Sequence, residues 1–364
     1  MSDKTKNVVV TITFLLFLFL VFLANLLKED TDISVTERRE LAKFPEITMK
    51  TILDGSATKK LEKYTTDQMI EREKFKKLKS TLEMNMFRKR DNNGIYEYGD
   101  SLIKIEYPLN EKSVINVANK INEMQEKYFK EMKCYYAIVP DKNYFTEDKN
   151  HIKMDYERLQ EIMREKVENA QYISLFDCLE LEDYYVTDIH WKQENLQKVV
   201  DKISTQMEFR DRLTIPYRKE KGIEFNGLYA GRLPIKTKKD EIWMLTNEAI
   251  ENAIVYHKES GKETEIYDKE KWDSNDKYDI YLSGPTPILT IENSNAKTEK
   301  ELIVVRDSFA SSLIPLFTEA YRKITLVDIR YMRSKEIEKY IELKDQEVLF
   351  LYSTLILNNS STLK

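Results

Sequence analysis

Strand-like and helix-like segments alternate along the C-terminal part of this chain, and the alternation constrains the fold more than any other feature. The apolar run CYYAIV precedes a helix-like stretch near Tyr156 to Glu168, and YISLF precedes a loop and a second stretch from Gln193 to about Met207. ELIVV, ITLVDI and EVLFLY repeat the pattern, with a helix-like stretch from Ser334 to Leu343 before the last. Such alternation predicts a mostly parallel sheet with helices on both faces.

The helical pattern gives way to short β-like pieces, separated by Gly, Asn and Asp, between about residues 210 and 295. We interpret this stretch as a mostly antiparallel β insertion in an α/β domain that spans residues 101–364. Residues 31–100 contain an extended lead and helix-like segments with a loose apolar stripe, and the turn from Asn92 to Gly94 introduces a hairpin over IYEYGDSLIKI. The sequence therefore predicts a three-layer α/β/α domain and a helical lead that packs on it.

An apolar run near the N-terminus, from Val8 to Leu27, contains no charged residue. About 20 residues at a rise of about 1.5 Å each match the hydrocarbon core of a bilayer, about 30 Å thick. Lys4 and Lys6 precede the run, which predicts a cytoplasmic N-terminus with the rest of the chain outside. A cleaved signal peptide is the alternative, but the run exceeds a usual h-region and no A-x-A-like site follows it. We expect residues 1–30 to be a cytoplasmic tail and a retained single-pass anchor.

Composition excludes several classes of protein. The formal charge of −5 is spread over interleaved Lys and Glu, so the sequence indicates no nucleic-acid partner. The 3 His and 2 Cys show no metal-ligand spacing, so no metal is expected. Cys134 begins one strand-like run and Cys178 follows another, so in neighbouring parallel strands they lie at opposite ends of the sheet, beyond disulfide reach.

Ser308 lies at the predicted junction between a strand and the helix that follows it. The buried-strand run from Leu302 to Val305 stops just before it, and apolar residues recur at helical spacing after it. Ligands of α/β folds bind outside the carboxyl ends of the strands, where a hydroxyl lies beside free backbone N–H groups and the positive end of a helix dipole. The position suits a nucleophile, and the alternative is a helix N-cap.

The stretch YYVTDIHW supplies partners for such a hydroxyl. Asp188 and His190 are two residues apart, so in an extended segment they project on the same side and the carboxylate can accept the imidazole N–H. With Ser308 they provide one of each member of a catalytic triad. In the alternative interpretation, His190 begins a helix and Asp188 caps it. His151 and His257 lie in polar surroundings and are predicted to be surface residues.

YYVTDIHW, the block RDSFASSLIPLFTEAYRKITLVDIRYM and the terminal EVLFLYSTLIL resemble the DHHW family of membrane-anchored bacterial proteins, related to the alginate O-acetyltransferases with SGNH-hydrolase-like domains. ERRELAKFP, YTTDQMIER and NNGIYEYGDSLIKI match as well, so the resemblance covers most of the chain after the anchor. In those acetyltransferases a D-x-H pair precedes the serine, as it does here. The resemblance implies an SGNH-hydrolase-like fold with Ser308 as nucleophile, His190 as base and Asp188 as orienting acid.

Two positions depart from the patterns of these families. Ile189 stands where the name-giving motif has its first histidine, and Arg306 stands where hydrolases usually have the glycine of GDS, which resembles the acetyltransferase branch. Asp307 either caps the helix or replaces Asp188 as the triad acid. Its side chain should diverge from that of Ser308, which favours the cap.

The sequence offers a few candidate donors for an oxyanion hole. The backbone N–H of Ser308 is the first. FNGLYAGR offers Asn226 and Gly227, which resemble a Gly-containing block of the family, although any hairpin turn uses the same pair. Arg330 follows the strand-like ITLVDI and would contact an anionic sugar or a developing charge, or else form an ion pair.

Two classes of function remain. The first is an extracytoplasmic O-acetyltransferase or acetyl esterase that modifies a cell-surface or secreted polysaccharide through Ser308 and needs no cofactor. Because acetyl-CoA is cytoplasmic, the resemblance implies a membrane-bound O-acyltransferase partner that relays the acetyl group. The second is a catalytically silent, membrane-anchored scaffold that binds polysaccharide or the partner enzyme, and the complete set of Asp, His and Ser argues against it.

Overall fold

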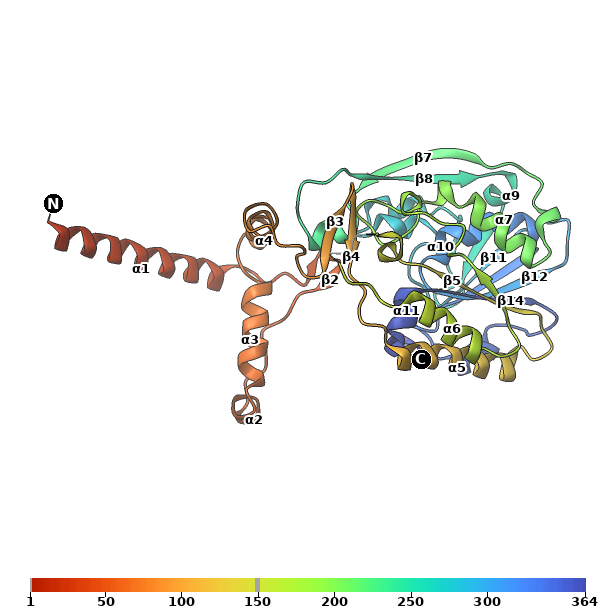
Figure 1. Ribbon diagram of the computed structural model, residues 1–364, viewed down its shortest axis with the longest axis horizontal. Coiled ribbons are helices and arrows are strands. Elements are labelled where there is room, and N and C mark those ends of the chain that lie inside the picture. The colour runs from red at the N-terminus through yellow and green to blue at the C-terminus, as the bar shows by residue number, and fades with distance from the viewer. Residues whose placement is uncertain (1, 148–150) are drawn as a thin grey trace. The chain divides into compact units, whose positions relative to one another are not determined.

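The computed structural model describes residues 2–147 and 151–364, and the chain divides into two compact units (Figure 1). Unit 1 comprises Met1–Asn92 and Gly231–Ile235. Unit 2 comprises Asn93–Ala230 and Lys236–Lys364. A five-residue segment from the predicted β insertion thus belongs to the N-terminal unit.

Unit 1 opens with the long helix α1 (Asp3–Leu27), which buries none of its residues. Ser2 caps it by accepting a hydrogen bond from the backbone N–H of Thr5. By length and composition it is the one helix of the described residues that could cross a membrane. Its 25 residues, at about 1.5 Å each, exceed the thickness of a bilayer core.

The rest of unit 1 is a short ribbon and three helices. These elements are β1 (Ile33–Ser34), β2 (Arg39–Glu40), α2 (Met49–Leu53), α3 (Ser56–Asp67) and α4 (Arg72–Thr81), which continues as a π-helical turn over Leu82–Met86. Gly55 separates α2 from α3 because it adopts a φ of 72°, a left-handed conformation that favours glycine.

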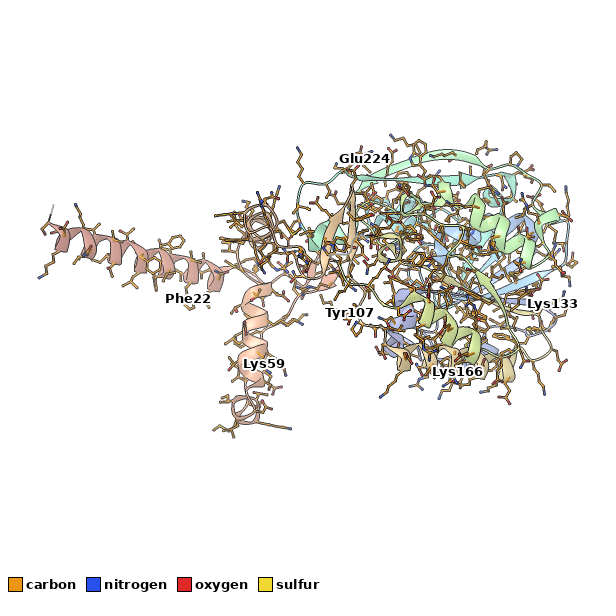
Figure 2. The ribbon with its side chains drawn as sticks, in the orientation of Figure 1. Phe22, Lys59, Tyr107, Lys133, Lys166 and Glu224 are labelled. Carbon is orange, nitrogen blue, oxygen red and sulfur yellow. The ribbon has the colours of Figure 1, made fainter. Side chains whose placement is uncertain are left out.

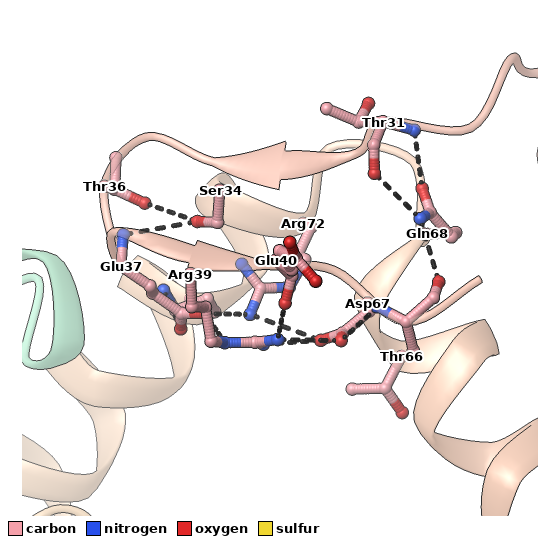
Figure 3. Close-up of polar contacts among 12 residues, drawn as sticks. Thr31, Ser34, Thr36, Glu37, Arg39, Glu40, Thr66, Asp67, Gln68 and Arg72 are labelled. Atoms are coloured by element: carbon pink, nitrogen blue, oxygen red, sulfur yellow. Dashed lines mark hydrogen bonds and ion pairs between the residues drawn. The ribbon is translucent and has the colours of Figure 1, made fainter. Parts of the chain in front are cut away.

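Polar side chains hold the lead segment of unit 1 to α3 and α4 (Figure 3). Arg39 donates two hydrogen bonds, of 2.8 and 2.6 Å, to the carboxylate of Asp67. Glu37 accepts ion pairs from Arg72 at 2.7 Å and Lys76 at 2.6 Å. The bond from Arg39 is the main reason why the pKa of Asp67 is lowered to about 2.

Unit 2 contains most of the regular structure. Its strands are β3 (Ile95–Tyr98), β4 (Ser101–Lys104), β5 (Cys134–Val139), β6 (Gln171–Ser174), β7 (Arg218–Phe225), β8 (Asp240–Thr246), β9 (Ile254–His257), β10 (Glu263–Thr264), β11 (Ile288–Glu292), β12 (Glu301–Arg306), β13 (Lys323–Val327) and β14 (Glu347–Ser353). Its helices are α5 (Glu111–Tyr128), α6 (Tyr156–Lys166), α7 (Gln197–Gln206), α9 (Glu248–Glu251), α10 (Ala310–Leu313) and α11 (Thr354–Asn358), and α8 (Leu228–Arg232) runs from unit 2 into unit 1.

Eight strands of the described residues form the central sheet of unit 2, in the order β10-β9-β11-β13-β12-β14-β5-β6. The five from β13 to β6 run parallel, whereas β11, β9 and β10 add antiparallel strands at one edge. Strand β7 pairs with β8 in a separate antiparallel ribbon. These pairings confirm the predicted fold class, a mostly parallel sheet with an antiparallel β insertion.

The sheet is covered on both faces, which makes three layers (Figure 1). Leu302 and Val304 of β12 lie in one apolar cluster with residues of α7 and α10, whereas Ile303 and Val305 lie in a second cluster with residues of α5 and α6. Strand residues alternate between faces, and burial on both faces explains the continuous apolar runs of the sequence.

The structure corrects three local predictions. The helix expected over Ser334 to Leu343 is a short 3₁₀ helix over Ser334–Lys339. The stretch from Gln193 begins with 3₁₀ helix η4 (Gln193–Asn195) before α7. His257, predicted to be a surface residue, is 6% exposed in β9, and its Nε2 atom lies 3.0 Å from Thr264 Oγ1. Cys134 is buried and Cys178 is partly buried, and both are free cysteines.

Candidate active site

Ser308 lies in a tight turn directly after β12, and its side chain is partly exposed. Asp307 fixes this turn, because its carboxylate accepts the backbone N–H of Phe309 at 3.0 Å and that of Ser353 at 2.7 Å. The second bond ties the turn to the end of β14. Asp307 thus fixes the turn through backbone bonds, whereas α10, whose N-cap is Phe309, has no side-chain cap.

The helix after Ser308 is shorter than the sequence predicts. Helix α10 spans only Ala310–Leu313, and a 3₁₀ helix over Ile314–Ala320 follows, with Pro315 near its start. Proline cannot donate a backbone hydrogen bond, which ends the α-helical pattern. A helix this short contributes little dipole, so the electrostatics of the site rest on individual side chains and N–H groups.

Asp188, His190 and Ser308 form a continuous chain of hydrogen bonds. The Nε2 atom of His190 lies 2.8 Å from Ser308 Oγ, and its Nδ1 atom lies 2.7 Å from Asp188 Oδ1. Both distances fall in the range of about 2.6–3.2 Å over which a general base acts. Asp188 is fully buried and His190 is 4% exposed, so the bond between these two side chains is shielded from water.

A buried lysine, Lys142, organises the loop that carries Asp188. Its Nζ donates to the backbone carbonyls of Tyr185 at 2.7 Å, Val186 at 2.9 Å and Asp188 at 3.2 Å. Burial lowers the pKa of Lys142 to about 7. Sequence analysis missed this residue, although a polar Asp-Lys pair just after the buried run CYYAIV was an available signal.

Asp240 holds the same loop from another side. Its carboxylate accepts the backbone N–H groups of Val186 and Thr187 at 2.6 and 2.7 Å, and the hydroxyl of Thr187 at 2.6 Å. Burial raises the pKa of Asp240, and these hydrogen bonds oppose the rise. No sequence pattern linked Asp240 to YYVTDIHW, because β8 supplies it from a distant part of the chain.

Gly227 packs directly behind Asp188. A Cβ atom at Gly227 would overlap the carbonyl oxygen of Thr187 and lie 2.5 Å from Asp188 Cα, so this close approach requires glycine. The N–H of Gly227 donates to Thr187 Oγ1 at 2.7 Å, and the N–H of Leu228 donates to Asp188 Oδ2 at 3.0 Å. The Gly227 amide thus already has an acceptor in the protein, whereas Asn226 is exposed.

Arg330 forms an ion pair. Its Nε and Nη2 atoms donate to the two carboxylate oxygens of Asp328 at 2.9 and 2.6 Å, and Asp328 is fully buried. The neighbouring Arg306 is also buried, and its Nη1 atom donates to Ser311 Oγ at 3.0 Å. Arg330 is therefore engaged within the protein, which is the ion-pair alternative that the sequence left open.

Tyr278, from the β-rich insertion, stacks on the imidazole of His190. The ring centroids are 3.8 Å apart and the planes differ by 6°. The hydroxyl of Tyr278 lies 2.7 Å from Ser312 Oγ, which also accepts the indole N–H of Trp191 at 3.0 Å. Tyr278 thereby fixes the plane of the imidazole, a contact that no sequence spacing indicated.

Ser308 also presents a free donor to a reacting group. Its backbone N–H makes no hydrogen bond within residues 2–147 and 151–364. Those residues contain no group of three His, Cys, Asp or Glu side chains arranged to hold a metal ion. The arrangement contains a hydroxyl, an imidazole, a carboxylate and a free backbone N–H, which are the kinds of group that acyl transfer uses.

The fold is a three-layer α/β/α arrangement, and a D-x-H pair precedes the serine in the sequence. No protein-family model matches the chain, and no curated protein matches it. Solved structures do match in fold. A DHHW family protein from Eubacterium siraeum superposes with a TM-score of 0.60 at 17% identity, covering 75% of this chain and 94% of that one.

PatB1 from Bacillus cereus is similar in the same way, with a TM-score of 0.56 at 18% identity over 73% of this chain and 97% of that one. PatB1 with a sulfonyl adduct gives a TM-score of 0.57 at 20% identity, over 72% of this chain and 97% of that one. The O-acetyltransferase domain of Pseudomonas putida AlgJ superposes with a lower TM-score of 0.46. The likeness shows that this chain has the DHHW-type, SGNH-like fold.

Proposed function

We propose that this chain is an O-acetyltransferase, or an acetyl esterase, with Ser308 as nucleophile. The observation that carries the proposal is the hydrogen-bond chain from Asp188 through His190 to a partly exposed Ser308. A serine with a purely structural role needs neither a hydrogen bond to a histidine nor a buried carboxylate bonded to that histidine. The shared fold with PatB1, which has been solved with a sulfonyl adduct, supports the proposal, since sulfonyl groups attach to activated hydroxyls.

In the first half-reaction, Ser308 Oγ attacks the carbonyl carbon of an acetyl ester while His190 Nε2 accepts the hydroxyl proton. Asp188 stays ionised and stabilises the imidazolium through its bond to Nδ1. The backbone N–H of Ser308 donates to the developing oxyanion. The tetrahedral intermediate collapses, the donor oxygen takes the proton from His190, and acetyl-Ser308 remains.

In the second half-reaction, an acceptor hydroxyl gives its proton to His190 and attacks the acetyl carbon. Collapse of the second intermediate breaks the bond to Ser308 Oγ, which recovers the proton. A sugar hydroxyl as acceptor gives a transferase, and water gives an esterase. No cofactor enters either step.

The proposed setting is extracytoplasmic. Helix α1 anchors the chain in the bacterial membrane with a cytoplasmic N-terminus, and the acceptor is a cell-surface or secreted polysaccharide. A membrane-bound O-acyltransferase partner relays the acetyl group. The charge-free run of α1 after Lys4 and Lys6 supports the orientation.

The test is a paired labelling and turnover assay on the full-length protein in detergent or nanodiscs. A sulfonyl fluoride should label Ser308, located by peptide mass spectrometry, and should abolish hydrolysis of an activated acetyl ester. Ser308→Ala should not be labelled, and its rate of ester turnover should be lower than that of wild type by about 10³-fold or more. Ser294→Ala, an exposed serine away from the site, is the matched control and should behave as wild type.

Stability separates this outcome from misfolding, because loss of the Ser308 hydroxyl should cost at most about 1 kcal/mol. Equal turnover by Ser308→Ala and wild type would overturn covalent catalysis by this serine. A folded wild-type protein with no turnover on any acetyl ester, but with retained binding to polysaccharide, would favour the scaffold alternative.

A further inference from the structure

Unit 1 exposes an apolar stripe along α4 and its π-helical extension. Phe75 is 50% exposed, Leu78 54%, Leu82 37% and Met86 69%. Their spacing places them on one side of the helix, because residues three or four apart share a face. We call these four residues the α4 stripe. Large apolar side chains that expose this much surface together mark a surface that something else covers.

The opposite side of α4 contacts the rest of unit 1. Lys76 pairs with Glu37 at 2.6 Å and donates to the carbonyl of Gly231 at 3.0 Å. Ser80 accepts a hydrogen bond from the side chain of Asn92 at 3.0 Å. These polar contacts fix which side of α4 faces the rest of unit 1. The α4 stripe, on the other side, therefore faces outward.

Lysines border the α4 stripe. Lys74 and Lys79 are exposed beside it, and Lys77 is exposed further round the helix. Of the ten residues of α4, REKFKKLKST, five are basic and one is acidic. The exposed acids nearby are engaged, since Glu71 pairs with Lys74 at 2.8 Å. A helix with an apolar face bordered by lysines fits an anionic lipid surface, where the lysine stems lie along the acyl boundary and the ammonium groups reach the headgroups.

The α4 stripe belongs to the same unit as α1. The backbone N–H of Ile70 donates to Asn25 Oδ1 at 2.7 Å, and Asn25 also bonds to the carbonyl of Val21 inside α1. Helix α4 begins two residues after Ile70. Its first turn is therefore tied to the last turns of the anchor helix, close to the level at which α1 leaves a bilayer.

Within unit 1, the helix directions fit this placement. Figure 1 shows α1 extended across the view, with α4 seen along its own length and α3 crossing the line of α1. Figure 2 shows side chains projecting from all around α1, Phe22 among them, and Lys59 projecting from α3. When α1 stands across a bilayer, a helix that crosses its direction runs along the membrane surface.

We propose that α4 binds the outer surface of the membrane that α1 crosses, with the α4 stripe in the acyl boundary and Lys74 and Lys79 at anionic headgroups. The proposal rests on the membrane anchoring of the proposed function and goes beyond it. A single span leaves unit 1 free to tilt, whereas a second contact beside it fixes its orientation to the bilayer.

Tryptophan substitutions in the full-length protein test the proposal. Leu78→Trp places an indole on the stripe, and Lys77→Trp places one on the exposed but polar side as a matched control. Phe17→Trp reports on α1 itself. Each variant is reconstituted in phosphatidylglycerol–phosphatidylcholine vesicles with and without brominated acyl chains, which quench nearby indoles. The signal of the native Trp191, Trp243 and Trp272, which lie in unit 2, is subtracted with wild-type protein.

We expect strong quenching at Phe17→Trp, clear quenching and a blue shift at Leu78→Trp, and little of either at Lys77→Trp. Quenching at Leu78→Trp should fall when phosphatidylcholine replaces phosphatidylglycerol or when salt is raised, since screening weakens headgroup contacts. Quenched Phe17→Trp with equal, low quenching at Leu78→Trp and Lys77→Trp would overturn the proposal and assign the stripe to a protein partner. Unquenched Phe17→Trp would overturn the anchoring and the proposal together, while leaving the ester turnover of Ser308 untouched.

Discussion

The two units of this chain are stabilised in different ways. Unit 2 buries apolar residues on both faces of its sheet, in two large clusters. In residues 2–92 only Leu41, Pro45 and Ala57 bury an apolar side chain, and bonds such as that between Arg39 and Asp67 hold the segments together. Each large buried side chain stabilises by about 1.5–3 kcal/mol, whereas partly exposed ion pairs contribute about 1 kcal/mol or less.

This difference suits the two proposed roles. A site that must hold a serine, a histidine and a carboxylate in line needs rigid surroundings. Lys142 and Asp240 fix loop 185–188, and this loop in turn accepts hydrogen bonds from loop 226–228. A membrane-side segment needs little core of its own when a lipid surface covers its apolar side chains. The experiments below ask whether activity and local stability separate along the same line.

The largest effect should come from Asp188→Asn. An amide in place of the carboxylate disturbs the bond to His190 Nδ1 and withdraws the charge that stabilises the imidazolium, so kcat for ester turnover should fall by about 10³–10⁴-fold. Hydrogen exchange of unit 1 should not change. Retention of more than a tenth of the wild-type kcat would contradict a triad role for Asp188.

Two glycines, four residues apart, offer a sharper comparison. Gly227→Ala forces a methyl group against Asp188 and should reduce turnover by about 10²-fold, since a displacement of about 1 Å costs that much. At Gly231 an added Cβ would overlap the carbonyl oxygen of Thr36 within unit 1. Gly231→Ala should therefore increase hydrogen exchange in residues 31–43 and leave kcat within about twofold of wild type. Equal losses of turnover in both variants would show that the two units are not separable in this way.

Tyr278→Leu should lower kcat by about tenfold with little change in KM, because the flat partner of the imidazolium is lost. Tyr278→Phe keeps the ring, loses only the hydroxyl bond to Ser312, and should restore most of kcat. Steady-state kinetics of both variants measure the separate changes in kcat and KM. If Phe is as damaging as Leu, the hydroxyl network, not the stacking, positions His190.

In unit 1, Asp67→Asn should weaken the lead segment by about 1 kcal/mol, because it removes the charged acceptor of a partly exposed ion pair. Hydrogen-exchange mass spectrometry of residues 31–43 checks this, with Glu46→Gln, an exposed acid, as the control. Ester turnover should stay at the wild-type level. A loss of turnover in Asp67→Asn alone would show that unit 1 contributes to the site.

The smallest effects concern pH, and they should have opposite signs in the two units. The pKa of Asp67 is lowered from 3.8 to about 2, mainly by Arg39, so its contribution to stability is present above pH 3.8 and is lost as pH falls through about 2. Burial raises the pKa of Asp141 in unit 2 from 3.8 to about 6, so its contribution is present below pH 3.8 and is lost as pH rises through about 6.

Two measurements separate these contributions. Cleavage of unit 1 by pepsin should increase between pH 4 and pH 2 in wild type and should depend less on pH in Asp67→Asn. Denaturant unfolding of unit 2 should show a fall in stability between pH 4 and pH 7 that Asp141→Asn reduces. A fall of the same size in Asp141→Asn would assign the pH dependence to other groups.

The sequence by itself determined the layers and the members of the candidate triad. Apolar runs such as Leu302 to Val305 are buried on both faces, and only a covered parallel sheet requires that pattern. The strand-to-helix position of Ser308 and the spacing of Asp188 and His190 are local features, visible without any fold. Their common place at one edge of the sheet followed from topology, since parallel strands end at the same edge.

Only the tertiary structure decided what surrounds the triad. Lys142, Asp240 and Tyr278 reach the site from segments distant in sequence, and the contacts are backbone carbonyls, backbone N–H groups and a ring face, none of which leaves a residue pattern. The short α10 depended on Pro315 and on burial from all sides. The outward face of α4 depended on which of its polar residues found partners in unit 1, and a helical period shows that faces exist without showing which one a protein covers.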